Sequence, residues 1–315
     1  MDVITFGETM VNFAPTAAGP IEMVPAFEKR IAGSETNVSI GLARLGHRVA
    51  WVSRLGDDGF GRFIYKTVRG EGVDVSAVIF DPDAPTGLYF KEYLGGGRTQ
   101  VHYYRRGSAA SRLRPEDVDL ARFPQARFLF ASGITPALSA SCRETAERAI
   151  EAAAARGVTV VFDPNMRRKL WREEEARPVL QRLAAASHLV LPGIDEGEIL
   201  TGSTDPERIA ERLLQGRTHA VVVKLGPEGA YYRTADGESG HVPGFTVQQV
   251  DEIGAGDAFA AGLMSGLLDG LSLPEAARRA CAMGALAVTG IGDYESLPYR
   301  RDLEAFMAGT ARATR

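Results

Sequence analysis

The segment 127–165, RFLFASGITPALSASCRETAERAIEAAAARGVTVVFDPN, decides the fold. It begins with RFLFASG and ends with VTVVFDPN, two runs that are almost continuously apolar, as in strands covered by helices on both faces. Between these runs, Ser141-x-x-Glu144 forms a capping box ahead of an alanine-rich stretch that closes at Gly157. The segment therefore predicts a strand, a helix and a second strand.

The same alternation recurs along the chain. Strand-like runs occupy residues 3–7, 49–56, 127–133, 158–165, 188–193 and 220–226. Asp205-Pro206 and Ser272-x-x-Glu275 mark two further helix starts. Alternating strands and helices predict an α/β fold with a doubly wound, mostly parallel sheet flanked by helices, which binds ligands at the carboxyl ends of its strands.

Two segments, 9–31 and 83–108, interrupt this pattern with glycine, proline and partly alternating aromatic and polar residues. In the second segment, GLYFKEYL and TQVHYYRR predict a β-hairpin whose turn is GGG at 95–97. We expect both segments to form a small antiparallel sheet that serves as a lid and as the contact surface of a homo-oligomer. The predicted main domain comprises 1–8, 32–82 and 109–315.

The composition of the chain argues against several classes of binding partner. The 315 residues carry a formal charge of -4, which gives no broad cationic surface for nucleic acid or anionic lipid. Cys142 and Cys281 lie in helical patterns and predict buried thiols. The N-terminus has no basic, apolar leader, and the longest apolar run, AFAAGLMSGLL at 258–268, is too short to span a bilayer. We therefore expect a cytoplasmic protein that has no membrane partner.

The stretch EIGAGDAF, residues 252–259, places two glycines and an acid before a run of small apolar residues. If a helix begins there, the backbone N–H groups of Gly254, Ala255 and Gly256 form an anion hole. Asp257 is then either a helix cap or a base beside a bound phosphoryl group. Neither a Walker-type loop nor a G-x-G-x-x-G follows a predicted strand, so other phosphate sites must be considered, and a nicotinamide-dependent dehydrogenase is disfavoured.

Five ordered motifs span nearly the whole chain: RIAGSETNVSIGLARLG, SRLGDDGFG, VVFDPNMR, VVVKLGPEGAYY and GAGDAFAAG. Together they resemble the ribokinase-like (PfkB) carbohydrate kinases. Within that family, GLYFKEY, VHYYRRGSAAS, SGITPALS, DPNMRRKLW and GDYESLPYRRDLE look most similar to 2-keto-3-deoxygluconate kinases. The resemblance implies ATP-dependent phosphorylation of a primary hydroxyl of this sugar acid.

The resemblance also implies roles for individual residues. Asp257 would be the catalytic base, the amides of Gly254, Ala255 and Gly256 would bind the transferred group, and Arg167 would lie between phosphate and sugar. The nucleotide would contact Asn165, Lys224, Gly226, Gly229, Gly254 and Gly256. The substrate would contact Gly33, Ser34, Asn37, Tyr89, Tyr103, Arg105, Arg167, Asp257 and Asp293. Glu196 would help to place Mg²⁺, and activation by a monovalent cation is left open.

We predict which residues of the small sheet bind the substrate from the charge of the substrate. A sugar acid carries a carboxylate, which requires a cation or several hydroxyl donors. On a strand, Tyr103 and Arg105 point to the same face, and Tyr89 on the partner strand can join them. We therefore expect Tyr103 and Arg105 to bind the carboxylate and Arg106 to face the other way.

The chain departs from the family pattern at two places. Glu252 follows Asp251 where many relatives have Thr or Pro, which puts a second acid near the triphosphate. The Asn of the family's Asn-x-x-Glu is replaced by Gly193, although Glu196 is retained. A fructokinase or another neutral-sugar kinase is the alternative in the same class, and a non-catalytic sugar-acid binding protein on this fold is the alternative in another.

Overall fold

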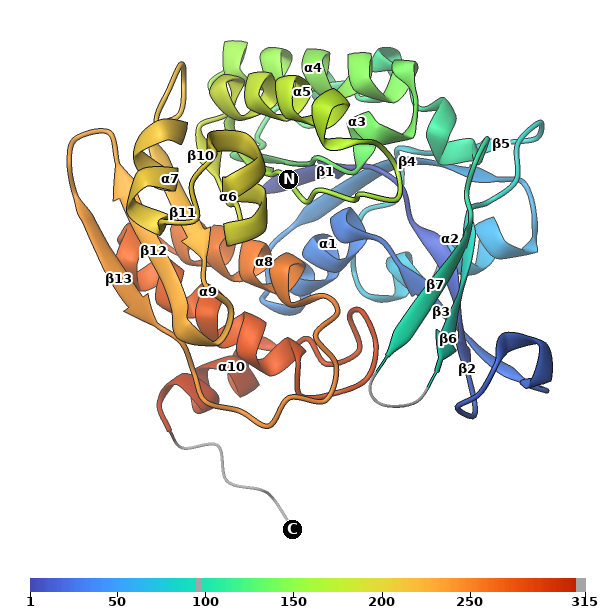
Figure 1. Ribbon diagram of the computed structural model, residues 1–315. Helices are drawn as coiled ribbons and strands as arrows, with labels where there is room; N and C mark the ends of the chain where they lie inside the picture. The colour runs from blue at the N-terminus through green and yellow to red at the C-terminus, as the bar shows by residue number, and fades with distance from the viewer. Residues whose placement is uncertain (95–97, 310–315) are drawn as a thin grey trace.

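The computed structural model describes residues 1–94 and 98–309. Within them, the centre of the molecule is a nine-stranded sheet with the strand order β13-β12-β11-β10-β9-β8-β1-β4-β5 (Figure 1). Its strands are β1 (Val3–Phe6), β4 (Val49–Gly56), β5 (Val78–Asp81), β8 (Phe128–Ser132), β9 (Thr159–Asp163), β10 (Leu189–Val190), β11 (Ala220–Lys224), β12 (Gly229–Thr234) and β13 (Ser239–Pro243).

The mostly parallel character of this sheet is confirmed. All neighbouring pairs from β11 to β5 run parallel, whereas β11, β12 and β13 form an antiparallel meander at one edge. All six predicted strands are present, but β5, β12 and β13 were not predicted. The chain places β4 on one side of β1 and then returns to place β8 on the other, so the strand order reverses beside β1. In open α/β sheets a ligand crevice forms at such a reversal.

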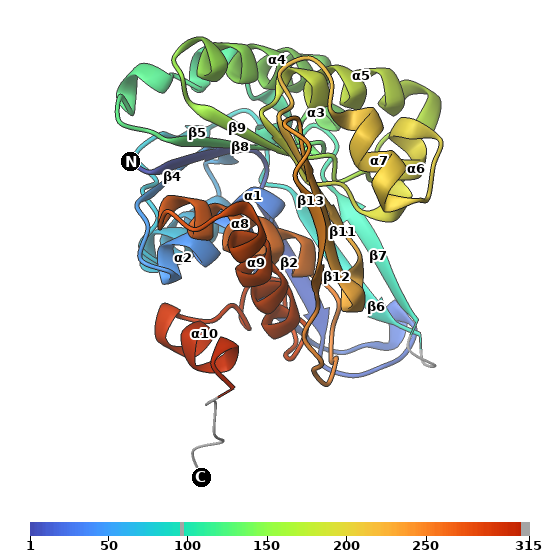
Figure 2. The ribbon, with the colours of Figure 1, turned by 90° about the vertical axis from the view of Figure 1, so that its left-hand side faces the viewer.

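Helices cover both faces of the sheet, as Figure 2 shows. One face packs against α1 (Ser34–Arg44), α2 (Gly59–Gly70), α8 (Ala255–Leu268) and α9 (Leu273–Ala287), with α10 (Arg300–Met307) packed on α9. The other packs against α3 (Thr135–Leu138), α4 (Ala140–Ala155), α5 (Glu173–Ala186), α6 (Ile194–Thr201) and α7 (Pro206–Leu213). The short 3-10 turns are η1 (Ile21–Met23), η2 (Ala109–Arg112), η3 (Pro115–Asp117), η4 (Leu120–Arg122) and η5 (Gly226–Glu228).

Strand β1 supplies side chains to both layers of the core. Ile4 and Phe6 belong to the apolar cluster under α4, and Val3 belongs to the cluster under α1 and α8. The remaining residue, Thr5, is fully buried and forms a 2.8 Å hydrogen bond with Ser39 of α1. Burial on both faces explains why these strands are almost continuously apolar in the sequence.

One predicted helix start was wrong by two residues. The cap of α4 is Ser139, whose Oγ accepts a 3.0 Å hydrogen bond from the backbone N of Cys142, and Ser141 lies in the first turn. The backbone of Ser139 is extended, as a cap requires, so Ser139 takes the role that the Ser141-x-x-Glu144 spacing had suggested. The starts at Asp205 and at Ser272 with Glu275 are confirmed.

The two interrupting segments form a separate four-stranded sheet, here called the small sheet, with the order β3-β2-β6-β7. Its strands are β2 (Met10–Pro15), β3 (Phe27–Ala32), β6 (Leu88–Tyr93) and β7 (Thr99–Tyr104). The predicted hairpin of β6 and β7 is confirmed, while its predicted turn at 95–97 lies outside the described residues.

The prediction of an antiparallel small sheet was wrong for its central pair, because β2 and β6 run parallel. Strand β2 follows the carboxyl end of β1, and β6 follows the carboxyl end of β5. Since β1 and β5 run in the same direction in the main sheet, both strands leave it at the same edge and enter the small sheet side by side (Figure 1). This route places the small sheet over the edge where ligands bind.

Across 1–94 and 98–309, no helix combines the length and apolar character that a membrane span requires.

Candidate active site

Four adjoining cavities lie where the carboxyl ends of the main strands face the small sheet and the start of α8, within the described residues. The inner cavity has a volume of about 190 Å³, the junction cavity about 400 Å³, the apolar cavity about 380 Å³ and the outer cavity about 750 Å³. Their linings include Tyr89 and Asp293 (inner), Asn165 and Glu196 (junction), Phe245 and Val288 (apolar), and Lys169 and Asp195 (outer).

Shared lining residues show that the first three cavities adjoin one another. Arg167, Gly254 and Asp257 line both the inner and the junction cavities. Lys224 and Gly256 line both the junction and the apolar cavities. A ligand pair can therefore meet in the junction cavity, one member entering from the apolar side and the other held under the small sheet.

The N-terminus of α8 forms the wall between the inner and the junction cavities. Gly254 is its cap residue, with a left-handed φ of 81°, and the helix begins at Ala255. A Cβ atom on Gly254 would lie 2.3 Å from the backbone O of Asp293, so only glycine fits here. Asp257 is the third helical residue and not the cap, which removes the capping alternative for its carboxylate. The free N–H groups of this turn provide an anion site.

The Asp257 carboxylate is held by the first turn of α1. Ser34 Oγ donates a 2.6 Å hydrogen bond to Asp257 Oδ1, and Asn37 Nδ2 donates a 2.8 Å hydrogen bond to Oδ2. Burial raises the pKa of Asp257, while these two hydrogen bonds and the nearby cations of Arg167 and Lys224 oppose that shift. A fixed carboxylate of this kind, exposed to two cavities, can accept a proton from a hydroxyl group that reacts between them.

The loop after β9 carries Asn165 in a left-handed conformation, with φ of 39°. The Asn165 side-chain amide donates a 2.9 Å hydrogen bond to Ser34 Oγ, and its backbone N donates to Asp163 Oδ1. Asn165 thus supports the chain of contacts that ends at Asp257, in addition to lining the junction cavity where it was predicted to meet phosphates. Strained non-glycine backbone of this kind gathers at functional sites.

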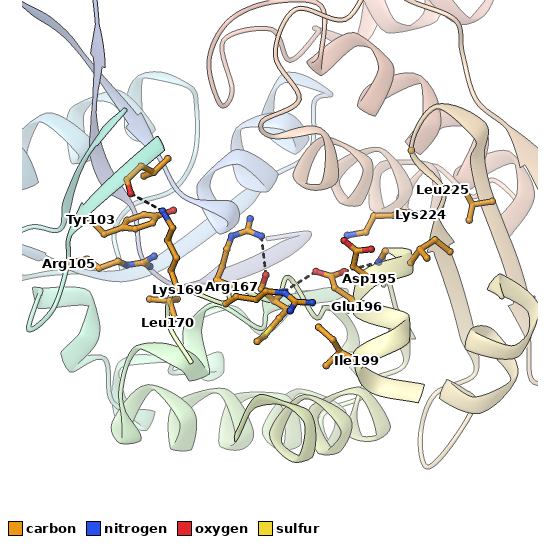
Figure 3. A pocket seen from close by; sticks show the side chains of 16 residues that line it. Tyr103, Arg105, Arg167, Lys169, Leu170, Asp195, Glu196, Ile199, Lys224 and Leu225 are labelled. Atoms are coloured by element: carbon orange, nitrogen blue, oxygen red, sulfur yellow. Dashed lines mark hydrogen bonds between the residues drawn. The ribbon is translucent and has the colours of Figure 1, made fainter. Parts of the chain in front are cut away.

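Arg167 lies two residues further along the same loop and is exposed. Its side chain lines the inner, junction and outer cavities, and its Nη1 donates a 3.5 Å hydrogen bond to the backbone O of Met166. Figure 3 places it between the cations Arg105 and Lys169 of the outer cavity and the acids Asp195 and Glu196. A guanidinium in this position can contact an anion in either neighbouring cavity.

Lys224, at the end of β11, provides a second cation beside the helix terminus. Its Nζ donates a 2.7 Å hydrogen bond to Asp163 Oδ2 and would lie 3.6 Å from a Cβ on Gly256. Burial raises the pKa of Asp163, and the ammonium of Lys224 opposes that shift. Asp163 holds Lys224 against the junction cavity, a role that sequence reasoning missed although this acid ends a predicted strand.

Gly226 and Gly229 both border the apolar cavity and both have left-handed φ angles, of 59° and 105°. A Cβ atom on Gly229 would lie 2.0 Å from the backbone O of Val242, so this glycine allows β12 and β13 to approach. The apolar walls of Phe245, Val247 and Val288 suit a flat aromatic group. Gly226 and Gly229, two of the four glycines predicted to contact the nucleotide, thus shape this cavity through the backbone.

Glu196 lines the junction and the outer cavities, but both of its carboxylate oxygens already accept backbone hydrogen bonds. The N–H of Met166 donates to Oε1 over 2.9 Å and the N–H of Gly193 donates to Oε2 over 2.8 Å. No cluster of three metal-ligating side chains occurs in the described part of the chain. One carboxylate near a phosphate site still fits Mg²⁺, which keeps several waters and binds mainly to phosphates.

The inner cavity contains the remaining predicted substrate residues. Tyr89 and Tyr103 pair across β6 and β7 with ring centroids 5.6 Å apart, and Tyr89 Oη donates a 3.3 Å hydrogen bond to Asp293 Oδ2. Burial raises the pKa of Asp293 to about 6, although Lys91 lowers it. Gly33 borders the same cavity, where a Cβ atom would lie 2.6 Å from the backbone O of Glu8. The structure therefore brings together every residue that was predicted to bind substrate.

Arg105 follows β7 and is buried, with its guanidinium 5.5 Å from the Tyr103 ring centroid. The predicted shared face holds for these two residues, whereas Arg106 is exposed and lines none of the four cavities. Arg105 is also paired with an acid: its Nε donates a 2.7 Å hydrogen bond to Glu8, which also accepts from Ser108. The charge of Arg105 is therefore partly balanced within the protein.

Besides Asp163, sequence reasoning assigned no role to three more buried charged residues around the site, Glu8, Glu35 and Lys91. Glu35 is fully buried behind the first turn of α1, accepts a 2.8 Å hydrogen bond from Thr135, and has its pKa raised to about 8 by burial. Glu8 and Lys91 line the inner cavity. For Lys91 the sequence signal is only that a charged residue interrupts a strand predicted to be half-buried, which is common on solvated strands.

Comparison with known proteins gives consistent results along the chain. The family model described as pfkB family carbohydrate kinase matches residues 1–300. A 2-dehydro-3-deoxygluconokinase from Bacillus subtilis is 43% identical over 311 residues, covering 98% of this chain and 96% of the relative. Fructokinase-1 from Oryza sativa is 36% identical over 306 residues, covering 94% of each chain.

Solved structures are similarly close. The PfkB protein from Polaromonas sp. JS666 is 46% identical, with a TM-score of 0.89, and the match covers 96% of this chain and 99% of that one. A fructokinase from Vibrio cholerae, solved with fructose, ADP and calcium ion, is 29% identical with a TM-score of 0.86, covering 98% and 99% of the two chains.

Proposed function

Because the chain belongs to the pfkB family of carbohydrate kinases, we propose that it transfers the γ-phosphoryl group of ATP to the primary hydroxyl of 2-keto-3-deoxy-D-gluconate. The observation that carries this proposal is the position of Asp257, fixed by Ser34 and Asn37 at the boundary between the inner and the junction cavities. The sugar acid would occupy the inner cavity, and the nucleotide base would occupy the apolar cavity. Their reacting groups would then meet beside Asp257.

In the proposed reaction the primary hydroxyl oxygen attacks the γ-phosphorus. A new O–P bond forms, the bond between the γ-phosphorus and the bridging oxygen breaks, and ADP leaves with that electron pair. Asp257 accepts the proton of the hydroxyl group. Its ionised form is favoured by the hydrogen bonds from Ser34 and Asn37, which offset part of the cost of burial.

The charge of the transferred group would be stabilised by parts of the protein that are already in place. The N–H groups at Gly254, Ala255 and Gly256 point along the α8 axis, and the cations of Lys224 and Arg167 flank them. Asn165, held between Asp163 and Ser34, would order the loop that brings Arg167 to the phosphate. Bound Mg²⁺, placed beside Glu196, would neutralise charge on the β- and γ-phosphates.

The proposal of an acid substrate is supported by the cations around the inner cavity. Arg105, Arg167 and Lys91 line it together with the hydroxyl groups of Tyr89 and Tyr103. Arg105 is paired with Glu8 and Lys91 lies near Asp293, whereas Arg167 forms no salt bridge with the described residues and acts on Asp257 only from a distance. We propose that the substrate carboxylate binds Tyr103 and Arg105, with its remaining charge facing Arg167.

A neutral-sugar kinase is the second candidate, favoured by the 36% identity with a fructokinase. The two candidates differ in the charge of the sugar, so one experiment separates them. ATP-dependent ADP release is measured with a panel of neutral sugars and sugar acids, 2-keto-3-deoxy-D-gluconate and fructose among them. A higher kcat/KM for fructose would reject the sugar-acid proposal, and no ADP release with any member would favour a non-catalytic binding protein.

We also propose that the small sheet is the contact surface of a homo-oligomer. Its outer face carries aromatic side chains from all four strands, with Phe90 between Phe13, Phe27 and Tyr104. Tyr104 is 66% exposed. An exposed aromatic group at the edge of such a cluster is typical of protein contact surfaces.

A further inference from the structure

Lys91 is a buried lysine on the cavity side of the small sheet. It lies on β6, its side chain is 2% exposed, and it lines the inner cavity. Its Nζ is 3.5 Å from Asp293 Oδ1 and 3.9 Å from Asp251 Oδ2. A buried ammonium is costly unless charged or polar partners surround it, so these two carboxylates account for its presence.

The two partners of Lys91 come from the segments that flank the start of α8. Asp251 Oδ1 accepts a 3.2 Å hydrogen bond from the N–H of Ile253, which orders the turn that leads to Gly254. Asp293 lies against the same turn from the other side, because its backbone O is the atom that a Cβ on Gly254 would strike. The ammonium of Lys91, on the small sheet, thus lies close to Asp251 and Asp293, the two acids that flank the N-terminus of α8.

The charge of Asp293 depends on this contact. Besides Lys91, Asp293 faces Tyr89 on β6, Glu295 in its own loop and Asp257 on α8. Burial raises the pKa of Asp293, Glu295 and Asp257 raise it further, and Lys91 lowers it. Lys91 is the cation that favours the ionised form of Asp293, the form with acceptor capacity on both oxygens.

We propose that Lys91 is a positioning residue: its ammonium, 3.5 Å from Asp293 Oδ1, holds that carboxylate in place for substrate hydroxyl groups. This inference rests on the proposed sugar kinase function. It assigns to Lys91 an effect on sugar recognition that acts through Asp293, so Lys91 need not contact the sugar. Lys91 lines neither the junction nor the apolar cavity, so binding of the nucleotide should be little affected.

The test compares Lys91→Met, Lys91→Arg and the control Lys29→Met. Lys29 belongs to the same small sheet but is exposed and lies over the Phe63 ring, away from the inner cavity. Steady-state kinetics are measured between about pH 5 and 9 with the best substrate of the wild-type panel. Thermal unfolding of each variant establishes that it is folded at the assay temperature.

For Lys91→Met we expect kcat/KM for the sugar to fall by about 10- to 100-fold, as for loss of a hydrogen bond to a charged group, mainly through KM. The KM for ATP should change less than about twofold, since Lys91 lies outside the two cavities proposed for the nucleotide. Because removal of Lys91 raises the pKa of Asp293, the acid limb of kcat/KM should move to higher pH by about one unit. Lys91→Arg should retain the wild-type limb, and Lys29→Met should match the wild type throughout.

A double variant supplies the second readout. If Lys91 acts through Asp293, Asp293→Asn should reduce kcat/KM much less in the Lys91→Met background than in the wild type. An unmoved acid limb in folded Lys91→Met, or full additivity of the two substitutions, would overturn the inference. All these comparisons between variants use whichever sugar the wild type phosphorylates. The sugar-acid proposal is judged from the wild-type panel alone, so its failure is distinguishable from failure of this inference.

Discussion

Ser34 and Asp257 lie 223 residues apart in the sequence, and the hydroxyl of Ser34 donates a 2.6 Å hydrogen bond to Asp257 Oδ1. Each residue belongs to the first turn of a helix, Ser34 to α1 and Asp257 to α8. Two helix N-termini therefore face the same space, and their unpaired N–H groups make it favourable for anions. The Asp257 carboxylate lies between these two N-termini and is held in place by α1.

This contact predicts a pH effect for Ser34→Ala. The Ser34 hydrogen bond lowers the pKa of Asp257, so its loss should raise that pKa and move the acid limb of kcat to higher pH. At neutral pH we expect kcat to fall by about 10- to 100-fold, the effect of losing one hydrogen bond to a charged group. Ser239→Ala, an exposed serine on β13, is the matched control. An acid limb that does not move would show that Ser34 does not tune Asp257.

Gly254 predicts a combined loss of stability and activity. It has a φ of 81°, and a Cβ added there would lie 2.3 Å from the backbone O of Asp293. Gly254→Ala should therefore cost about 2 kcal/mol of unfolding free energy or more, and it should lower kcat because the anion site must shift. In Gly59→Ala the new Cβ meets nothing within 4 Å, and stability should be unchanged or slightly higher. Urea unfolding of both variants measures the difference.

Arg105 and Arg106 provide a matched pair for the substrate carboxylate. Arg105→Ala should raise the KM for the sugar acid by about 10- to 100-fold, since a charge-assisted contact is lost, and should leave Glu8 without its arginine partner. Arg106→Ala, which removes an exposed arginine outside the cavities, should leave KM unchanged. The carboxylate assignment would be wrong if Arg106→Ala abolished activity while Arg105→Ala kept the wild-type KM.

The oligomer proposal is tested at the outer face of the small sheet. Tyr104→Asp places a charge at the exposed edge of the aromatic cluster and should dissociate the oligomer at micromolar protein concentration. Tyr299→Asp, another exposed tyrosine that lies outside the small sheet, should leave the assembly intact. Sedimentation equilibrium distinguishes the two variants. A wild-type protein that sediments as a monomer would reject the proposal.

The sequence predicted the main sheet well because its strands are buried on both faces and their apolar runs are bounded by clear turn residues. It could not predict the central parallel pair of the small sheet, β2 and β6, because pairing between distant strands leaves no local pattern. The error at Ser141 has a similar origin: Ser139 and Ser141 are both suitable caps, and the backbone selects Ser139.

At the site, the family motifs predicted the residues around Asp257, but the contacts between them depend on the tertiary fold. Asn165 was expected to meet phosphates, and its amide also supports Ser34. The pairing of Arg105 with Glu8 and of Lys91 with Asp293 joins residues 97 and 202 positions apart. A charged residue on a predicted strand gives no indication of such a partner, so these buried pairs appear only in the structure.

The most direct test of the central claim is the steady-state kinetics of Asp257→Asn with ATP and 2-keto-3-deoxy-D-gluconate, measured by coupled ADP release. Asparagine retains the shape of the side chain but cannot accept the proton of the attacking hydroxyl. We predict that kcat falls by about 100- to 10,000-fold while both KM values stay within a few-fold of wild type. Turnover close to the wild-type value in this variant would contradict the assignment of Asp257 as the base.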